Sequence, residues 1–320
     1  MSESKAHHQA DEMARLPQDD EVGRESPAPP ERQPIPADWR HRELYALVRN
    51  ALYALPSFFR SPLVVSGVLA TDLFTFNSSL AATIETQVVD ALNELRPTWD
   101  PRQNYTLYRF VRQSQKFPDV ILRTSAPDVK PAIIMGIELK GWYVLAKEGE
   151  PSFRYKATPA VCAPWDLLAV YPWALSNVIS GSPRLYDPYV ESARYAAEYR
   201  NWHWQYAKGG TGAGIVLSPV DHVYPAKSDQ ISDVARRDAG RNFGRFARTG
   251  IMDQYKENLF RETLAGIPLG SWLRFFALFR DDQTDEEITR AMGDFVGDAH
   301  GTGDQTTEAQ RANRRTKKSR

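Results

Sequence analysis

Four strand-like runs follow one another between residues 104 and 175, and they constrain the fold more than any other feature of the chain. They are rich in β-branched and aromatic residues, are bounded by Pro, Gly, Asp or Asn, and cover residues 104–111, 117–124, 131–145 and 166–175. Such runs predict β-strands, and strands that are close in sequence are usually neighbours in space. The sequence therefore predicts one central sheet built from this part of the chain.

Helical patterns lie on both sides of these runs. Before the strands, apolar side chains at helical spacing predict a first helix that ends at Pro56 and a second that runs from a cap at 77–79 to Arg96. After the strands, the pattern predicts a helix over 188–208 and a fifth strand over 214–220, followed by mainly helical structure. The expected fold class is α/β, with a central mixed β-sheet flanked by helices and an additional, mainly helical C-terminal part.

The two ends of the chain differ in composition from the part between them. Residues 1–37 are polar and rich in Pro, and residues 301–320 close with a basic run, so neither end has enough apolar surface to offset the entropy cost of ordering. We therefore expect a disordered leader over 1–37, a single folded domain over 38–300 and a disordered basic tail over 301–320.

Charge and cysteine content limit the classes of partner and site. Forty basic residues balance forty acidic residues, so any surface for nucleic acid must be a local patch. The single cysteine, Cys162, excludes a disulfide within the chain and a zinc site built from several thiolates, and it is typical of a reducing compartment. No stretch reaches the roughly 20 apolar residues that span a bilayer, so we predict a cytoplasmic protein without a membrane partner.

Two neighbouring predicted strands hold the residues that suggest chemistry. Asp119 opens one strand, and Glu138 and Lys140 lie near the end of the next, with Glu138 nineteen residues after Asp119. Residues two apart in a strand point to the same face, so Glu138 and Lys140 share one face of the sheet. If the two strands pair, the Asp119 carboxylate joins them.

This combination of side chains is suited to cutting a phosphodiester bond. Two carboxylates are hard oxygen ligands for Mg²⁺ and leave coordination positions open for water and a phosphate oxygen. A lysine beside them can orient the attacking water and favour its hydroxide form. The predicted cofactor is therefore Mg²⁺.

Pro118-Asp119, followed after a hairpin-sized gap by Glu138-Leu139-Lys140, resembles the signature of the PD-(D/E)XK nuclease superfamily. The resemblance implies that Asp119 and Glu138 bind the metal, that the Leu139 carbonyl is a further ligand, and that Lys140 is the base or the group that orients water. It also implies a glutamate from a preceding helix, for which Glu85 is the candidate. An exposed carboxylate with no function is an equally good interpretation of Glu85.

The resemblance covers residues 79–175 and implies a restriction-endonuclease-like catalytic core, with recognition and dimerisation elements over 185–296. It favours a type II restriction endonuclease: a homodimer that cuts double-stranded DNA at a specific sequence and is encoded next to a cognate DNA methyltransferase. A DNA repair or phage-defence nuclease is the enzymatic alternative. A catalytically silent DNA-binding protein with the same fold is the alternative from a different class.

A second candidate for DNA contact lies further along the chain, in a run with five arginines and one aspartate between 236 and 248. Arginine suits phosphate and guanine contacts, and the glycines in this run favour a loop that approaches a backbone. The predicted DNA-binding residues are Arg236, Arg237, Arg241, Asn242, Arg245 and Arg248. The alternative is a solvated helix face without a partner.

Simpler structural interpretations exist for the catalytic candidates as well. Glu138 and Lys140 can be an exposed ion pair on an edge strand, which contributes little to stability. The continuous apolar run before them argues for a central strand instead. Asp119 taken alone suggests a Pro-Asp turn, and only its spacing to Glu138 and Lys140 promotes it to a site residue.

Overall fold

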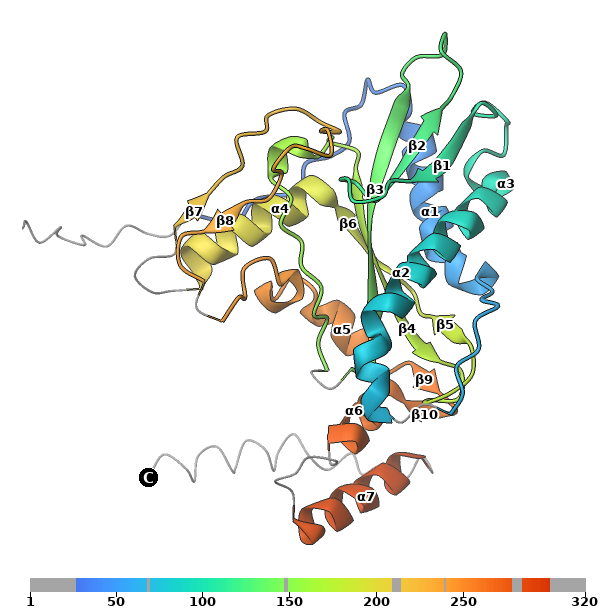
Figure 1. The fold of residues 1–320 in the computed structure, drawn as a ribbon, viewed down its shortest axis with the longest axis vertical. Helices are drawn as coiled ribbons and strands as arrows, with labels where there is room; N and C mark the ends of the chain where they lie inside the picture. Colours follow the sequence, from blue (N-terminus) through green and yellow to red (C-terminus); the bar gives the residue numbers. More distant parts are fainter. Residues whose placement is uncertain are drawn as a thin grey trace, which may run out of the picture.

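The computed structural model describes residues 27–67, 70–146, 149–208, 214–238, 240–277 and 284–299. Its centre is a mixed, curled sheet with helices on both faces, so the predicted α/β class with a mixed, helix-flanked sheet is confirmed (Figure 1). The predicted leader up to residue 26 and the predicted tail from residue 301 lie outside the described residues. No helix in the described part of the chain has the length and apolar character needed to cross a membrane.

The central sheet has six strands in the order β1-β2-β3-β4-β5, with β6 paired to β4 beside β5. The strands are β1 (Tyr108–Arg112), β2 (Val120–Thr124), β3 (Ile133–Tyr143), β4 (Leu167–Leu175), β5 (Pro183–Leu185) and β6 (Tyr189–Ser192). The four predicted strands are therefore confirmed as neighbours in one sheet. Most pairs are antiparallel, whereas β3 and β4 run parallel.

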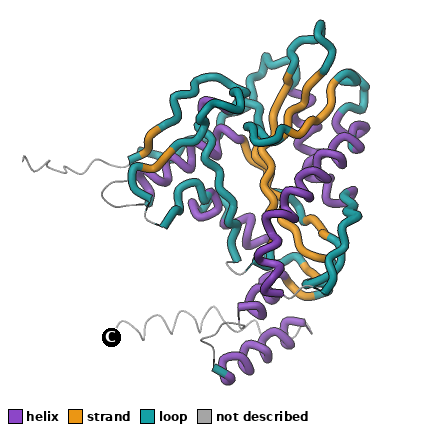
Figure 2. The backbone as a smooth tube through the Cα atoms, in the orientation of Figure 1, coloured by secondary structure: helices purple, strands orange, loops and turns teal. Residues whose placement is uncertain are grey.

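Helices cover the two faces of this sheet (Figure 2). The α-helices in the described part of the chain are α1 (Arg42–Phe58), α2 (Ala70–Glu94), α3 (Arg96–Trp99), α4 (Ala193–Trp202), α5 (Asp253–Leu259), α6 (Leu269–Ala277) and α7 (Asp285–Ala299). Of these, α6 and α7 pack against each other and β10, beyond one end of the sheet. α2 packs on β1 and β3, and α1 packs on α2 and α3, while α4 covers β4 and β6 from the other face. β3 and β4 are thus enclosed by helices, which explains their nearly continuous apolar sequence.

The first two helices differ from the sequence prediction at their ends. Pro56 does not end α1 but lies inside it, and the helix continues to Phe58. Proline leaves the carbonyl four residues earlier without its helical partner, and here the Tyr171 hydroxyl of β4 donates a 3.0 Å hydrogen bond to that carbonyl of Leu52. The predicted cap at 77–79 is also wrong, because α2 already begins at Ala70.

The predicted helix over 188–208 is wrong at its start. Residues Tyr189–Ser192 form β6 on the edge of β4, and α4 begins only at Ala193, with the Ser192 hydroxyl accepting a hydrogen bond from Tyr195 N at 3.3 Å. Pairing with β4 overrides the local helical pattern, as tertiary contacts often do. α4 then continues as a π-helix over His203–Ala207.

The predicted fifth strand is short and lies outside the central sheet. β7 (Ile215–Val216) pairs only with β8 (Val234–Ala235), forming a two-stranded ribbon beside α4 (Figure 1). A second two-stranded ribbon, β9 (Thr263–Leu264) with β10 (Ile267–Pro268), precedes α6. Helices α5 to α7 agree with the mainly helical structure expected near the C-terminus, but residues 217–252 contain no α-helix among those described.

Residues 27–37, the end of the predicted leader, have defined contacts with α4 and β6. Arg32 Nη2 lies 2.9 Å from Glu191 Oε2, and the Arg32 guanidinium lies 4.6 Å from the centre of the Tyr195 ring. The indole N–H of Trp202 donates a 2.7 Å hydrogen bond to the Pro27 carbonyl. Charge and ring contacts of this kind hold the segment in place, although it has few large apolar side chains.

Close packing at Gly136 determines how closely the residues just before β2 approach β3. A Cβ atom on Gly136 would lie only 2.3 Å from Pro118 Cγ and 3.1 Å from Asp166 Oδ1. Asp166 Oδ1 accepts a 2.7 Å hydrogen bond from Gly136 N, while Asp166 Oδ2 accepts one of 2.8 Å from Ala163 N. The glycine therefore allows the residues before Asp119 to lie directly against β3.

We expect Gly136→Ala to lower the free energy of unfolding by about 1–3 kcal/mol, the usual cost of overpacking a core. The matched control is Gly293→Ala in α7, where a Cβ meets no atom within 4 Å, so a neutral or slightly stabilising effect is expected there. Urea denaturation of both variants measures the difference. Equal stability of the two variants would contradict this account of the packing.

Candidate active site

Strand pairing brings Asp119 and Glu138 together. Val120 of β2 is opposite Ile137 of β3, so the preceding residue, Asp119, lies beside Glu138. The Asp119 main-chain N–H donates to Glu138 Oε2 at 3.2 Å, and the Leu139 N–H donates to Asp119 Oδ2 at 3.0 Å. Each carboxylate is thus fixed by the backbone of the other strand.

Lys140 joins the same site from the next same-face position of β3. Its ammonium nitrogen lies 2.6 Å from Glu138 Oε1, 3.2 Å from Asp119 Oδ2 and 2.9 Å from the Leu139 carbonyl oxygen. The three oxygens that the sequence assigns to a metal therefore converge on one cationic atom. The interpretation of Glu138 and Lys140 as an exposed pair is wrong, because their side chains are only 12% and 17% exposed, although the pairing of β3 with β2 ends at Ile137.

Burial and mutual attraction determine the charge state of this group. Burial raises the pKa of Glu138 to about 7, and the nearby Asp119 adds to this shift, while Lys140 opposes it. Burial alone would lower the pKa of Lys140, but Glu138 and Asp119 together raise it above its ordinary value. Lys140 is therefore an ammonium at neutral pH that offsets two carboxylates, and in this state it has no free electron pair with which to act as a base.

Glu85 reaches the same region from α2. Gly141, which follows Lys140, lets α2 approach closely, because a Cβ there would lie 3.1 Å from Ala81 Cβ. Glu85 is one helical turn after Ala81 on the same face of α2, and its pKa is influenced by the charges of Asp119 and Lys140. Burial and the neighbouring Asp119 raise the pKa of Glu85. The predicted glutamate of the preceding helix is thus near the other site residues, and the interpretation as an exposed carboxylate does not hold.

The donor set fits a hard divalent cation. Two carboxylates and a main-chain carbonyl are oxygen ligands of the type that Mg²⁺ prefers, and the Lys140 ammonium already stands as a cation among them. Over the described ranges, no group of three or more His, Cys, Asp or Glu side chains is placed to hold a metal. The protein ligands of Mg²⁺ here would therefore be Asp119, Glu138 and the Leu139 carbonyl.

A basic cleft opens beside Glu138. Its volume is about 360 Å³, and its wall includes Lys116, Arg154, Lys156 and Lys227. These residues come from the segment before β2, the segment after β3 and the loop before β8. Sequence reasoning missed all four because they are scattered singly along the chain; the only local signal is Lys116, three residues before Asp119.

The predicted DNA-binding residues between 236 and 248 do not line the cleft at Glu138. Of these six residues, Asn242, Arg245 and Arg248 line a second cavity next to the end of α4, while none belongs to the lining of the cleft at Glu138. Arg236, Arg237 and Arg241 are exposed. The two regions are joined through one segment, since Arg154 Nη2 donates to the Arg241 carbonyl at 2.9 Å and Tyr155 N donates to the Gly244 carbonyl at 2.7 Å.

Comparisons with protein families, with curated proteins and with solved structures found no significant match.

We expect divalent-ion binding to compete with protonation of Glu138. Since burial raises the pKa of Glu138 to about 7, its carboxylate is mostly protonated below that pH and must lose the proton to bind Mg²⁺. The apparent affinity for Mg²⁺ should fall by about tenfold per pH unit below 7 and level off above it, because one proton is released per ion bound. Calorimetric titration from pH 5.5 to 8.5 measures this dependence.

The control for that titration is Asp128→Asn, which removes an exposed carboxylate from the turn between β2 and β3 and should leave the curve unchanged. Asp119→Asn should weaken binding at every pH. An affinity that is constant from pH 5.5 to 8.5 would contradict the assignment of Glu138 as a ligand.

Proposed function

We propose that the protein is a Mg²⁺-dependent endonuclease that hydrolyses phosphodiester bonds of double-stranded DNA. The observation that carries the proposal is that oxygens of Asp119, Glu138 and the Leu139 carbonyl lie together, all within hydrogen-bond distance of the Lys140 ammonium. This arrangement is fixed by two paired strands and does not depend on a mobile loop. The resemblance of Pro118-Asp119 and Glu138-Leu139-Lys140 to the PD-(D/E)XK signature agrees with it.

Each group of the site has a part in the proposed chemistry. Bound Mg²⁺ would offset the negative charge that builds on the phosphate in the transition state. Asp119 and Glu138 supply the negative charge that holds it, and their backbone hydrogen bonds keep both carboxylates oriented. The Lys140 ammonium can donate hydrogen bonds to the attacking water and to a phosphate oxygen, so we assign it to orienting rather than to taking the proton. Glu85 adds a further carboxylate near Asp119.

The cleft supports a polyanionic substrate. Four cationic residues, Lys116, Arg154, Lys156 and Lys227, share its wall with two acidic residues, Glu138 and Asp229. Contacts of this kind to phosphates supply most of the sequence-independent affinity for nucleic acid. The proposed path of the substrate backbone therefore runs along these residues and past Glu138.

The finer part of the proposal is that the protein is a type II restriction endonuclease with a restriction-endonuclease-like core. This part adds sequence specificity, a homodimer and a neighbouring methyltransferase gene. They rest on the resemblance and on the ordered elements beyond β4. A repair or phage-defence nuclease would use the same site with a different substrate preference. A catalytically silent DNA-binding protein is disfavoured, because Asp119, Glu138 and Lys140 are all present and mutually oriented.

The test is incubation of the purified protein with mixed-sequence duplex DNA and Mg²⁺, with EDTA as a control. We expect wild-type cleavage, and losses of about 100-fold or more in rate for Asp119→Asn and Lys140→Ala, because each removes several kcal/mol of transition-state stabilisation. The exposed variant Asp128→Asn should cut like the wild type. Discrete fragments would support sequence specificity, and random fragments would favour a repair or defence nuclease.

Intact DNA that is still bound by the wild type in the presence of Mg²⁺ would overturn the nuclease proposal in favour of the silent binder. Cleavage that survives Asp119→Asn would mean that another site performs the reaction.

A further inference from the structure

A second cavity, of about 220 Å³, lies between the end of α4 and the segment 242–249. Its lining includes His203, Trp204, Lys208, Asn242, Arg245 and Arg248. The segment 154–157 separates this cavity from the catalytic cleft: Arg154, Lys156 and Ala157 line the cleft, while Tyr155 N bonds to Gly244 on the cavity side. The cavity therefore does not belong to the proposed metal site.

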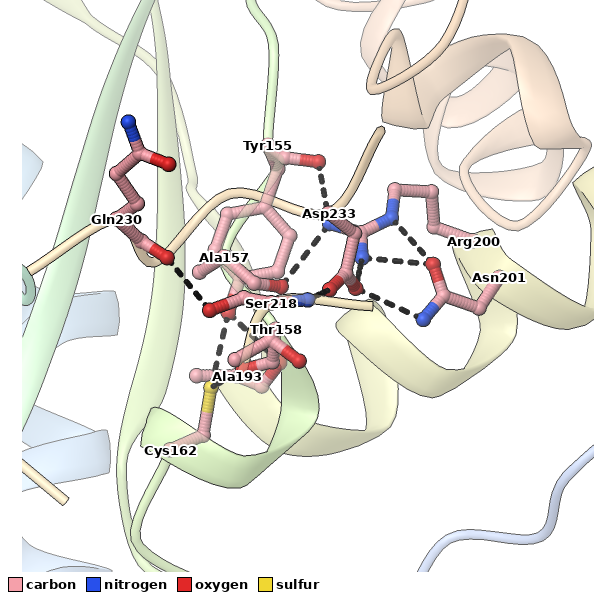
Figure 3. Close-up of polar contacts among 10 residues, drawn as sticks. All are labelled: Tyr155, Ala157, Thr158, Cys162, Ala193, Arg200, Asn201, Ser218, Gln230 and Asp233. Atoms are coloured by element: carbon pink, nitrogen blue, oxygen red, sulfur yellow. Dashed lines mark hydrogen bonds and ion pairs between the residues drawn. The ribbon is translucent and has the colours of Figure 1, made fainter. Parts of the chain in front are cut away.

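The wall between the two regions is held by a buried arginine. Arg200 Nη1 donates to the carbonyls of Tyr155 and Ala157 at 2.8 and 3.1 Å, and Nη2 lies 2.7 Å from Asp233 Oδ2 (Figure 3). Nε and Nη2 also donate to Asn201 Oδ1 at 3.1 and 2.7 Å. Since a guanidinium has five N–H donors, these contacts use all of them. Arg200 is thus a fixed part of the wall and not a ligand-binding group.

The other polar groups of the cavity are mostly hydrogen-bond donors. Lys208, Arg245 and Arg248 contribute three positive charges, and no Asp or Glu is among the described residues that line the space. Glu150 Oε2 lies 3.5 Å from Arg248 Nε, and Glu150 is itself 42% exposed. Asn242 Oδ1 accepts a 2.8 Å hydrogen bond from Arg248 Nη1 and so helps to orient that guanidinium.

Trp204 forms part of the cavity wall. Its side chain is buried, and Lys208 Nζ lies 3.5 Å from the centre of its indole ring. This cation–π contact holds the Lys208 ammonium at the cavity.

We infer that this cavity binds a phosphate group. Phosphate presents several strong acceptor oxygens to donors that approach from different directions, which matches two guanidinium groups and an ammonium around one space. His203 also lines the cavity, and its pKa is lowered mainly by burial and further by the nearby Lys208. The inference rests on the proposed function only for the source of the phosphate, which we take to be the backbone of the DNA that occupies the cleft.

Such a site would hold the substrate at a second point. Arg154 contributes to the cleft and bonds to the Arg241 carbonyl, next to Asn242 of the cavity. A duplex held both in the cleft and at the cavity would have its register relative to the metal site fixed by two anchors. Contacts to phosphate position a nucleic acid without reading its bases.

The test measures duplex binding by fluorescence anisotropy in EDTA at several NaCl concentrations, for the wild type, Lys208→Gln and Arg248→Gln. Loss of one phosphate contact should lower the slope of log affinity against log salt by about one unit and weaken binding to all sequences alike. The matched control, Arg49→Gln, removes an exposed charge on α1 and should retain the wild-type slope. Thermal unfolding in buffer without phosphate checks that every variant is folded.

A second arm tests a free anion. Inorganic phosphate and pyrophosphate should raise the melting temperature of the wild type and of Arg49→Gln, but not of Lys208→Gln or Arg248→Gln, because a ligand stabilises only the form that binds it. A shift with these anions and no change in the DNA slope supports the cavity and assigns it to free phosphate. Wild-type slopes and wild-type shifts in both cavity variants would overturn the inference.

The outcomes separate this inference from the nuclease proposal, because neither arm requires cleavage. DNA cutting combined with unchanged slopes would retain the nuclease and reject the phosphate cavity. Altered slopes without cutting would retain the cavity and reject the nuclease.

Discussion

The pairing of β3 with a strand on each side is the constraint on which the rest of the structure depends. β3 runs parallel to β4 over Ile137 to Tyr143 and antiparallel to β2 at its other edge. A lysine and a glutamate in such a central strand lose most of their contact with water, and unpaired charges there would be very unfavourable. Asp119, at the entry to β2, completes a group in which the ammonium contacts both carboxylates. The register of the strands therefore determines that the three catalytic candidates lie together.

The same group is electrostatically suited to a divalent cation. Asp119 and Glu138 both contact the single Lys140 ammonium, and burial together with repulsion from Asp119 raises the pKa values of Glu138 and of the nearby Glu85. A second positive charge would relieve that repulsion. This excess of negative charge in a buried place has no evident benefit for stability, which makes a functional explanation the better one.

Buried polar groups away from this centre position the basic wall of the cleft. Asp166 accepts hydrogen bonds from Gly136 N and from the Tyr224 hydroxyl at 2.7 and 2.9 Å, and so ties β3 to the loop that carries Lys227. Arg200, which is paired with Asp233, holds the segment that carries Lys156, because it donates hydrogen bonds to the carbonyls of Tyr155 and Ala157. Fully hydrogen-bonded buried networks of this kind fix one geometry, and here they fix where positive charge faces the cleft.

Local signals in the sequence are enough to predict the α/β class, the four successive strands and the trio of Asp119, Glu138 and Lys140, because alternation and apolar runs are local and two residues of the trio share one strand. Which basic residues reach the site depends on the folded chain, since Lys116, Arg154, Lys156 and Lys227 are separated in sequence and meet through strand order and loop packing. The tertiary structure also decided the element ends that sequence reasoning placed wrongly: Tyr171 satisfies the carbonyl that Pro56 leaves free, and β4 pairs with Tyr189–Ser192 in place of a helix. In each case a distant partner supplied or took a backbone hydrogen bond, and no local pattern records such a partner.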